Sequence, residues 1–224
     1  MQFEQELADI LPPDVPNRAL LIEKSAQHLE MLVAVNEYMN LTRILGPKEA
    51  AIKHVFDCVA PWRHFEHSRR VLDAGTGAGF PGIPLAIVLP EVRFTLAESI
   101  GKKAKFVDSV VETLHLPNVH VANERAETIA SAQKPDTITA RAVAPTERLL
   151  DLFGKTVRHG ARLLLFKGPE IEGELAQVRE RSLQAEVLCR YDLPEALGTR
   201  SLIEIRASAV GSELPRKRAT ATRG

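Results

Sequence analysis

Cysteine, net charge, aromatic side chains and long hydrophobic runs are all scarce in this sequence, and their scarcity excludes several classes of protein. Only two cysteines, Cys58 and Cys189, occur among 224 residues, in no CxxC or CxxH spacing. This usage favours reduced thiols over a disulfide or a metal site. No apolar run reaches the roughly 18 residues of a membrane helix, and the acidic N-terminus has no cleavable apolar segment of a secretory signal. We therefore expect a cytoplasmic, metal-free protein that contacts no membrane.

Charge is balanced overall but uneven along the chain. Lys+Arg and Asp+Glu each number 29, which argues against wrapping of nucleic acid over the whole surface but allows a local basic patch. Residues 199–224 carry six basic and two acidic side chains. The segment PRKRATATRG near the end has no apolar periodicity, so residues 209–224 are predicted to form a flexible basic tail. Such a tail fits either plain solvation or contact with nucleic acid.

Apolar periodicity divides the chain into a helical part and an alternating α/β part. Residues from about 17 to 65 are predicted to be helical, with one apolar face formed by Ile22, Leu29, Leu32, Val33 and Met39. From Arg70 onward, short β-rich runs alternate with helical ones, which predicts five parallel strands of a doubly wound, Rossmann-like sheet with helices on both faces. Two further strands close together predict a terminal antiparallel hairpin. We expect an N-terminal helical extension over residues 1–68 and an α/β domain over 69–208.

A glycine-rich segment, LDAGTGAGFPGIPLAI, follows the first predicted strand. Ligands of α/β sheets bind outside the carboxyl ends of the strands, where this loop is expected to lie. Its spacing, Gly75, Gly77 and Gly79, is not the G-x-G-x-x-G of dinucleotide sites, because Phe80 stands where a glycine would be required. No Gly-Lys-Ser/Thr follows, so a P-loop is excluded too. The loop suits a nucleoside with a zwitterionic appendage, such as S-adenosylmethionine.

Acidic residues at the ends of neighbouring strands support this cofactor. Asp73 precedes the glycines, where a carboxylate can orient a cationic amino-acid tail. Glu98 ends the second predicted strand, where a carboxylate can accept both hydroxyls of a ribose. Ala126 and Glu127 follow the third strand, beside the expected adenine. Together these positions favour a class I methyltransferase over an NAD enzyme.

Several motifs also resemble one known family, in order along the chain. They are NLTRI, HVFD, LDAGTGAGFPGIPLAI, ES followed by KKAKF, ERAE, ARAVAP and FKG. In this order they resemble the RsmG, or GidB, family of bacterial methyltransferases. The resemblance implies methylation of N7 of guanine 527 in the 530 loop of 16S rRNA, on the RNA, the small subunit or an assembly intermediate. It also implies cofactor contacts at Gly75, Phe80, Ala126, Glu127 and Arg141. The sequence itself gives no oligomeric state, and we expect a monomer. Cys58, where the family is expected to have serine, and the basic tail depart from the pattern.

The residues themselves also bear on the methylated atom. ARAVAP stands in place of the [N/D]-P-P-[Y/F] loop that enzymes methylating an exocyclic amine usually have, which disfavours an amine target, and neither cysteine is well placed to attack a pyrimidine. Guanine N7 needs no deprotonation, so no catalytic acid or base is predicted, only positioning. Arg141 and Lys167 are candidates for RNA contact, with a salt bridge and a plain surface lysine as the respective alternatives. His54 and Asp57, three residues apart on one predicted helix, favour a structural pair across the domain junction.

Two other functions remain open from the sequence. One is a methyltransferase that acts on a small molecule or on another RNA. The other is a non-catalytic assembly factor that uses the fold only to bind RNA, although Asp73, Glu98 and the three loop glycines make up a complete cofactor site.

Overall fold

A seven-stranded sheet forms the centre of the protein. The computed structural model describes residues 2–208, so the tail predicted at 209–224 lies outside the described residues. The strands are β1 Arg70–Ala74, β2 Arg93–Ala97, β3 Val119–Ala122, β4 Thr137–Arg141, β5 Arg162–Lys167, β6 Leu183–Asp192 and β7 Thr199–Ala207. Their order is β3-β2-β1-β4-β5-β7-β6. The first five are parallel, and β7 runs antiparallel to both β5 and β6, which confirms the predicted sheet and hairpin.

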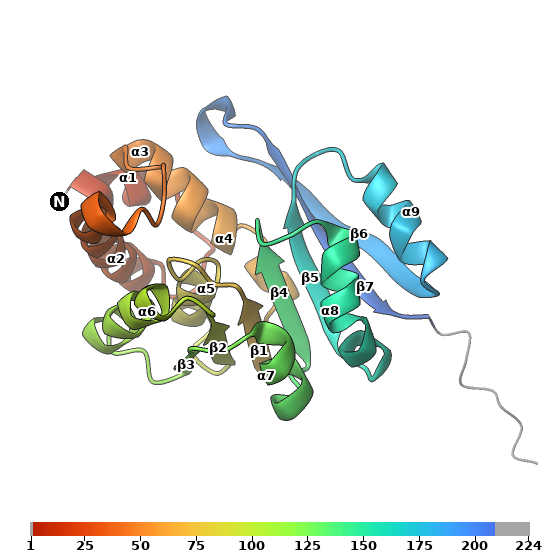
Figure 1. Ribbon diagram of the computed structural model, residues 1–224. Coiled ribbons are helices and arrows are strands. Elements are labelled where there is room, and N and C mark those ends of the chain that lie inside the picture. The colour runs from red at the N-terminus through yellow and green to blue at the C-terminus, as the bar shows by residue number, and fades with distance from the viewer. Residues whose placement is uncertain (1, 209–224) are drawn as a thin grey trace, which may run out of the picture.

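Helices cover both faces of the sheet (Figure 1). Along β5, Leu163 and Leu165 join the hydrophobic cluster on one face, whereas Leu164 and Phe166 join the cluster on the other, as the two-residue period of a strand requires. Strands buried on both faces are the usual composition of a parallel sheet. The covering helices are α5 Gly82–Val88 and α6 Gly101–Thr113 on one face, and α7 Ala126–Gln133, α8 Thr146–Arg158 and α9 Glu172–Glu180 on the other.

The N-terminal helices pack outside α5 and α6 and extend the same core. They are α1 Gln2–Ile10, α2 Arg18–Met39, α3 Pro47–Ala50, a π-helical turn Ala51–Phe56 and α4 Asp57–Val59, followed by a short 3-10 turn at Trp62–His64. A second 3-10 turn, Pro194–Ala196, connects β6 to β7. Helix α2 contacts both α5 and α6, and its buried apolar side chains belong to the cluster that contains Val71 and Phe94. Because α1 starts at Gln2, the helical part begins earlier than the predicted start near residue 17. The domain division at residue 68 stays a prediction.

One detail of the predicted apolar face of α2 is wrong. Val33 is 37% exposed, whereas Leu29 and Leu32 are buried. The buried stripe continues from Leu32 to Asn36, whose side chain bonds to the backbone of Thr42 in the following turn. A helix turns by about 100° per residue, so burial of Leu32 carries its neighbour Val33 toward solvent. Among residues 2–208, no helix combines the length and the apolarity needed to cross a bilayer.

Candidate active site

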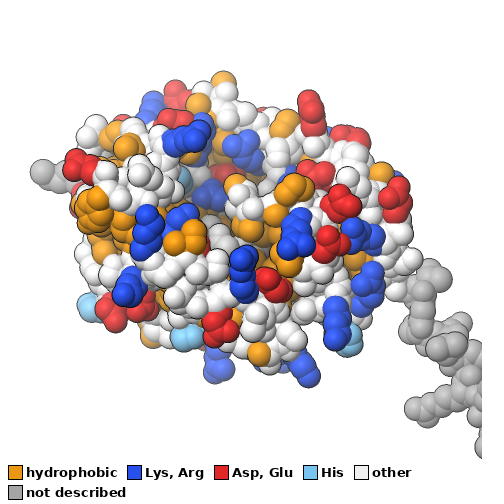
Figure 2. Space-filling model, viewed as in Figure 1, with side chains coloured by type: hydrophobic (Ala, Val, Ile, Leu, Met, Phe, Trp, Pro, Cys, Tyr) orange, Lys and Arg blue, Asp and Glu red, His pale blue; other side chains and the backbone are white. Residues whose placement is uncertain are grey.

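A cavity of about 760 Å³ opens at the carboxyl ends of the parallel strands, where an α/β sheet binds ligands. Of the residues singled out from the sequence, Gly75, Gly77, Phe80, Glu98, Arg141 and Lys167 line it. Five basic residues contribute to its wall: Lys53, Lys103, Arg141, Lys167 and Arg200. Figure 2 shows Lys and Arg side chains around the hollowed centre of this face.

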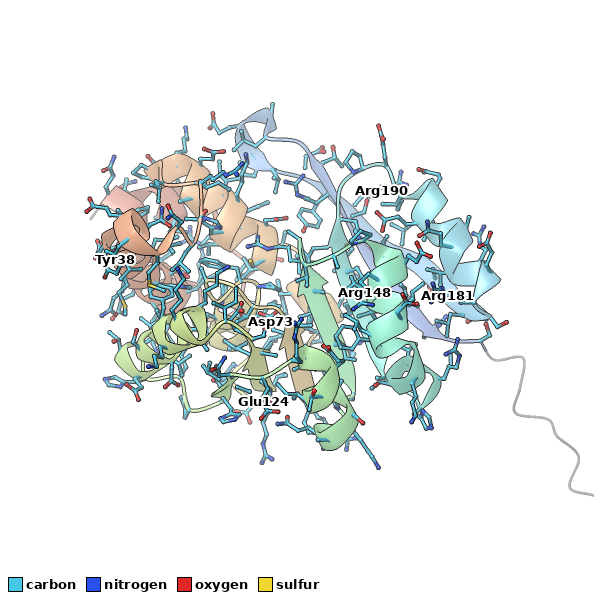
Figure 3. The ribbon with its side chains drawn as sticks, viewed as in Figure 1. Tyr38, Asp73, Glu124, Arg148, Arg181 and Arg190 are labelled. Atoms are coloured by element: carbon cyan, nitrogen blue, oxygen red, sulfur yellow. The ribbon has the colours of Figure 1, made fainter. Side chains whose placement is uncertain are left out.

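The remaining predicted cofactor residues lie outside the cavity wall. Asp73 is fully buried at the end of β1, at the centre of the molecule (Figure 3). Gly79 turns toward α2 and α5, where a Cβ atom would lie 2.5 Å from Ile83. Ala126 and Glu127 form the first turn of α7, half-buried. The roles predicted for these four residues stay predictions.

The glycine loop takes a backbone conformation that other residues rarely adopt. Gly75, Gly77 and Gly79 all have positive φ angles, of 69°, 63° and 99°, a region that only glycine enters without strain. The amides of Gly75 and Thr76 both donate to the carbonyl of Ala97 at 3.0 Å. This pairing ties the loop to the end of β2, and so to Glu98.

Asp73 holds the two ends of the glycine loop by hydrogen bonds. Its Oδ2 accepts hydrogen bonds from Thr76 Oγ1 at 2.6 Å and from the amide of Gly82 at 2.9 Å. Its Oδ1 is buried and has no hydrogen-bond partner among the described residues. Burial raises the pKa of Asp73 to about 6, although both hydrogen bonds act in the opposite direction. The carboxylate therefore keeps one oxygen for a further donor.

Glu98 connects the loop with the segment that leads into α6. Its Oε2 accepts from the amide of Gly77 at 3.2 Å, and its Oε1 from the amide of Ile100 at 2.8 Å. A carboxylate offers about four lone-pair positions, so each oxygen can still accept another hydrogen bond. Glu98 also lines the cavity, as a residue that binds ribose hydroxyls would have to do.

Phe80 lies between two histidine rings. The ring of His28, from α2, stacks on it at 4.6 Å between centroids, and that of His54, from the π-helical turn, at 4.7 Å on another side. Burial lowers the pKa of His28 to about 4, and burial together with the charge of Arg141 lowers that of His54 to about 3. Both imidazoles are therefore neutral at physiological pH. Sequence reasoning missed His28, because nothing in its helix indicates a contact with a ring as distant in the sequence as Phe80.

These shifted groups predict how stability depends on pH. We expect the free energy of unfolding to fall as the pH drops from about 6 to about 4, because the unfolded chain protonates His28 and His54 near their ordinary pKa of 6.5 while the folded protein keeps them neutral. Each histidine then costs about 1.4 kcal/mol per pH unit. Asp73 acts oppositely, since it takes up its proton near pH 6 in the folded protein but only near 3.8 when unfolded. The net loss from these three groups is about 1.4 kcal/mol per pH unit.

Urea denaturation at pH 6, 5 and 4 measures this slope. The variant His28→Phe keeps an aromatic ring but removes one titrating group, so the slope should become clearly shallower than in the unaltered protein. An unchanged slope would mean that His28 is already protonated in the folded state.

Asp57 joins the N-terminal helices to three strands at the rear of the cavity. Its carboxylate pairs with Arg141 of β4 at 3.2 Å, accepts from the hydroxyl of Tyr191 on β6 at 3.0 Å and lies 3.7 Å from Arg200 of β7. Arg141 also donates to the carbonyl of Lys53 at 2.6 Å. The salt bridge considered for Arg141 is therefore present. Asp57 thus connects the N-terminal helices to strands of the sheet.

The other predicted polar residues are also engaged. His54 bonds to Thr42 Oγ1 at 3.1 Å, within the N-terminal part. Lys167 is only 14% exposed and pairs with Glu174 of α9 at 2.8 Å, so it is not the plain surface lysine considered as its alternative. Tyr191 and Arg200 were missed by the sequence reasoning. Arg200 reaches the cavity because β7 pairs antiparallel with β5, in a register that places Ser201 opposite Lys167. No local sequence motif indicates this register.

Comparison with known proteins identifies the family of this chain. The family described as rRNA small subunit methyltransferase G, GidB, matches residues 21–203. The chain belongs to the GidB family. The GidB match runs from α2 to β7 and so includes both histidines that stack on Phe80, as well as Asp57 and Arg200. It confirms the family that the sequence motifs resemble.

Individual relatives show how far the similarity extends. "Ribosomal RNA small subunit methyltransferase G" of Solibacter usitatus is 50% identical over 210 residues, which is 92% of this GidB chain and 100% of the relative. Among solved structures, precorrin-6y C5,15-methyltransferase from Geobacter metallireducens has a TM-score of 0.51 at 14% identity, over 66% of this chain and 87% of that one. A structure of MtNAS with S-adenosylmethionine has a TM-score of 0.55 at 15% identity, over 85% and 73%. At these identities the structures establish the Rossmann-like fold alone.

Proposed function

We propose that this chain transfers the methyl group of S-adenosylmethionine to N7 of guanine 527 in the 530 loop of 16S rRNA. The observation that carries the proposal is the cavity at the strand ends of a GidB-family chain, with a glycine loop and a glutamate where such a cofactor needs them. We further propose that the protein acts as a cytoplasmic monomer on 16S rRNA within the small subunit or an assembly intermediate.

The chain's own residues fit this cofactor. A Cβ atom on Gly77 would meet nothing closer than the Gly75 carbonyl at 4.0 Å, so space lies directly against the loop. Glu98 has free lone pairs for ribose hydroxyls. Asp73 is buried behind the cavity wall, so its unpartnered Oδ1 is proposed to accept from the amino group of the methionine tail through a water molecule. Ala126 and Glu127, at the start of α7, remain our candidates for the adenine.

The chemistry asks for alignment rather than proton transfer. S-adenosylmethionine supplies the methyl group when it is bound. Guanine N7 attacks with an exposed lone pair and has no proton to lose, so the residues around it have to hold it in line and exclude water. Such positioning contributes roughly 7–11 kcal/mol to lowering a barrier. Because N7 has no proton to lose, no base is needed, and two titratable groups of the cavity wall are engaged in other contacts: neutral His54 is stacked on Phe80, and Asp57 is paired with Arg141.

Arg141 and Lys167 are proposed to contact the RNA, with the pairings described above holding them in place. We expect Arg141→Gln to lower the turnover of ribosomal subunits more than it lowers affinity for S-adenosylmethionine. A guanidinium supplies five N–H donors, and the hydrogen bonds of Arg141 to Lys53 and Asp57 use only its Nη1. Arg190→Gln is the control, because Arg190 is an exposed residue of β6 paired with Glu172. An equal loss of cofactor affinity and turnover would assign Arg141 to the cofactor instead.

The decisive experiment is mass spectrometry of the 530-loop guanine in ribosomal RNA from cells with and without the gene. We expect 7-methylguanine to disappear with the gene and to return with it. An unchanged mark, together with normal cofactor binding in vitro, would favour another RNA or a small molecule as substrate. Absence of cofactor binding would favour the non-catalytic assembly factor.

A further inference from the structure

His28 touches three consecutive residues of the cofactor loop. Its ring stacks on Phe80 with an interplanar angle of 16°. Its Nε2 lies 2.8 Å from the carbonyl oxygen of Ala78. Its Cε1 lies 3.2 Å from the position that a Cβ atom on Gly79 would take. One side chain of α2 therefore bounds the loop from Ala78 to Phe80.

The chemistry of these contacts fixes the state of the ring. A carbonyl only accepts hydrogen bonds, so His28 Nε2 carries the hydrogen and donates it to Ala78. The other nitrogen, Nδ1, then carries a lone pair, and it is buried without a partner among the described residues. His28 is 1% exposed, which keeps this ring neutral.

His54 repeats the arrangement on another side of Phe80. Its ring stacks with an interplanar angle of 10°, and its Nε2 is bonded to Thr42 while its Nδ1 is buried without a partner. Each unpaired buried nitrogen lowers the free energy of unfolding, because an unsatisfied buried polar atom destabilises a protein. Aliphatic side chains would pack the same volume without this cost. The arrangement is therefore better explained by what the rings do to the loop.

We propose that His28 and His54 are positioning residues for the cofactor site: together they clamp Phe80, and His28 also holds the Ala78 carbonyl, so that the loop keeps its binding shape. Ala78 and Phe80 both line the cavity, so a shift of either would change the surface that the cofactor meets. Helix α2 thereby becomes part of the cofactor site, although His28 itself does not line the cavity. The inference rests on the proposed binding of S-adenosylmethionine.

Two variants of His28 separate the hydrogen bond from the stack. His28→Phe keeps a flat ring against Phe80 but removes the donor to Ala78, whereas His28→Gln offers an amide donor near the place of Nε2 but removes the ring. Val157→Ala is the matched control, because Val157 is a fully buried residue of α8 in the hydrophobic cluster on the other face of the sheet, which contains no residue of the loop. All three should lower the melting temperature.

Titration calorimetry with S-adenosylmethionine, on the full chain, tests the proposal. We expect the Kd to rise about tenfold in His28→Phe and about threefold in His28→Gln, and to stay unchanged in Val157→Ala. In methylation assays the KM for the cofactor should rise in His28→Phe while the KM for ribosomal subunits stays the same. A purely structural role predicts lower melting temperatures with unaltered Kd in all three variants, and this result would overturn the clamp. If the unaltered protein fails to bind the cofactor, the proposed function itself fails, which is a different outcome.

Discussion

Gly77→Val is expected to abolish binding of S-adenosylmethionine, and with it methyl transfer, while the protein remains folded. The φ angle of Gly77 is 63°, and a Cβ atom there has open space around it. Because Gly77 lines the cavity, the valine side chain would occupy the volume proposed for the cofactor. Its strained backbone would also disturb the amide that donates to Glu98. We expect affinity to fall at least 100-fold, which corresponds to about 2.7 kcal/mol.

Backbone strain alone has to be separated from this steric effect. A non-glycine residue in the left-handed region costs about 1–3 kcal/mol, wherever it stands. Gly160 offers a matched control, because its φ is 105° and a Cβ atom there would meet nothing within 4 Å. Gly160→Val should lower the melting temperature yet leave the calorimetric Kd for S-adenosylmethionine unchanged. Normal cofactor affinity in Gly77→Val would show that the loop does not hold the cofactor.

The sheet and the glycine loop could be predicted because their signals are local. Each strand appears as a short apolar run, and Glu98 follows such a run directly. Parallel strands bring their carboxyl ends to one edge of the sheet, so Glu98 and the glycines meet once the order of strands is known. In the structure the two do meet: the amide of Gly77 donates a hydrogen bond to Glu98 at 3.2 Å.

The clamp on Phe80 could not be predicted in the same way. His28 reaches the loop only because α2 packs on α5 and α6, and no spacing in the sequence encodes the angle at which helices cross. A histidine on a helix among leucines indicates burial at most. The π-helical turn that presents His54 is hidden for a similar reason, since its sequence has the periodicity of an ordinary helix.

The environment of Arg141 shows a third limit. From the sequence, Arg141 could either contact RNA or form a salt bridge. The structure contains the salt bridge, with Asp57 as the partner. The pairing depends on residues 84 positions apart, and it does not remove the first possibility. An arginine held by a carboxylate is better oriented for a further ligand than a free one.

Asp57→Ala is expected to be the most destabilising substitution of a charged residue at the site. Asp57 is 4% exposed and is the acidic partner of both Arg141 and Arg200. Its removal leaves two guanidinium groups facing each other across a partly buried space, and the Tyr191 hydroxyl loses one of its two acceptors. Breaking a buried ion pair on one side typically costs about 3–5 kcal/mol. Because Arg200 is 26% exposed and partly screened by solvent, we expect the lower end, about 3 kcal/mol.

Urea denaturation of three variants measures this contribution. Asp57→Asn keeps an oxygen for Tyr191 but no charge, so it should lose about half as much stability as Asp57→Ala. Asp14→Ala breaks a pair with Arg63 in which both side chains are more than half exposed, and such surface pairs contribute about 0–1 kcal/mol. A loss in Asp57→Ala no larger than in Asp14→Ala would mean that solvent already compensates the two arginines. The expected result is that Asp57→Ala loses the most stability, Asp57→Asn about half as much and Asp14→Ala the least. This order would show that one carboxylate stabilises the contact between the N-terminal helices and β4, β6 and β7.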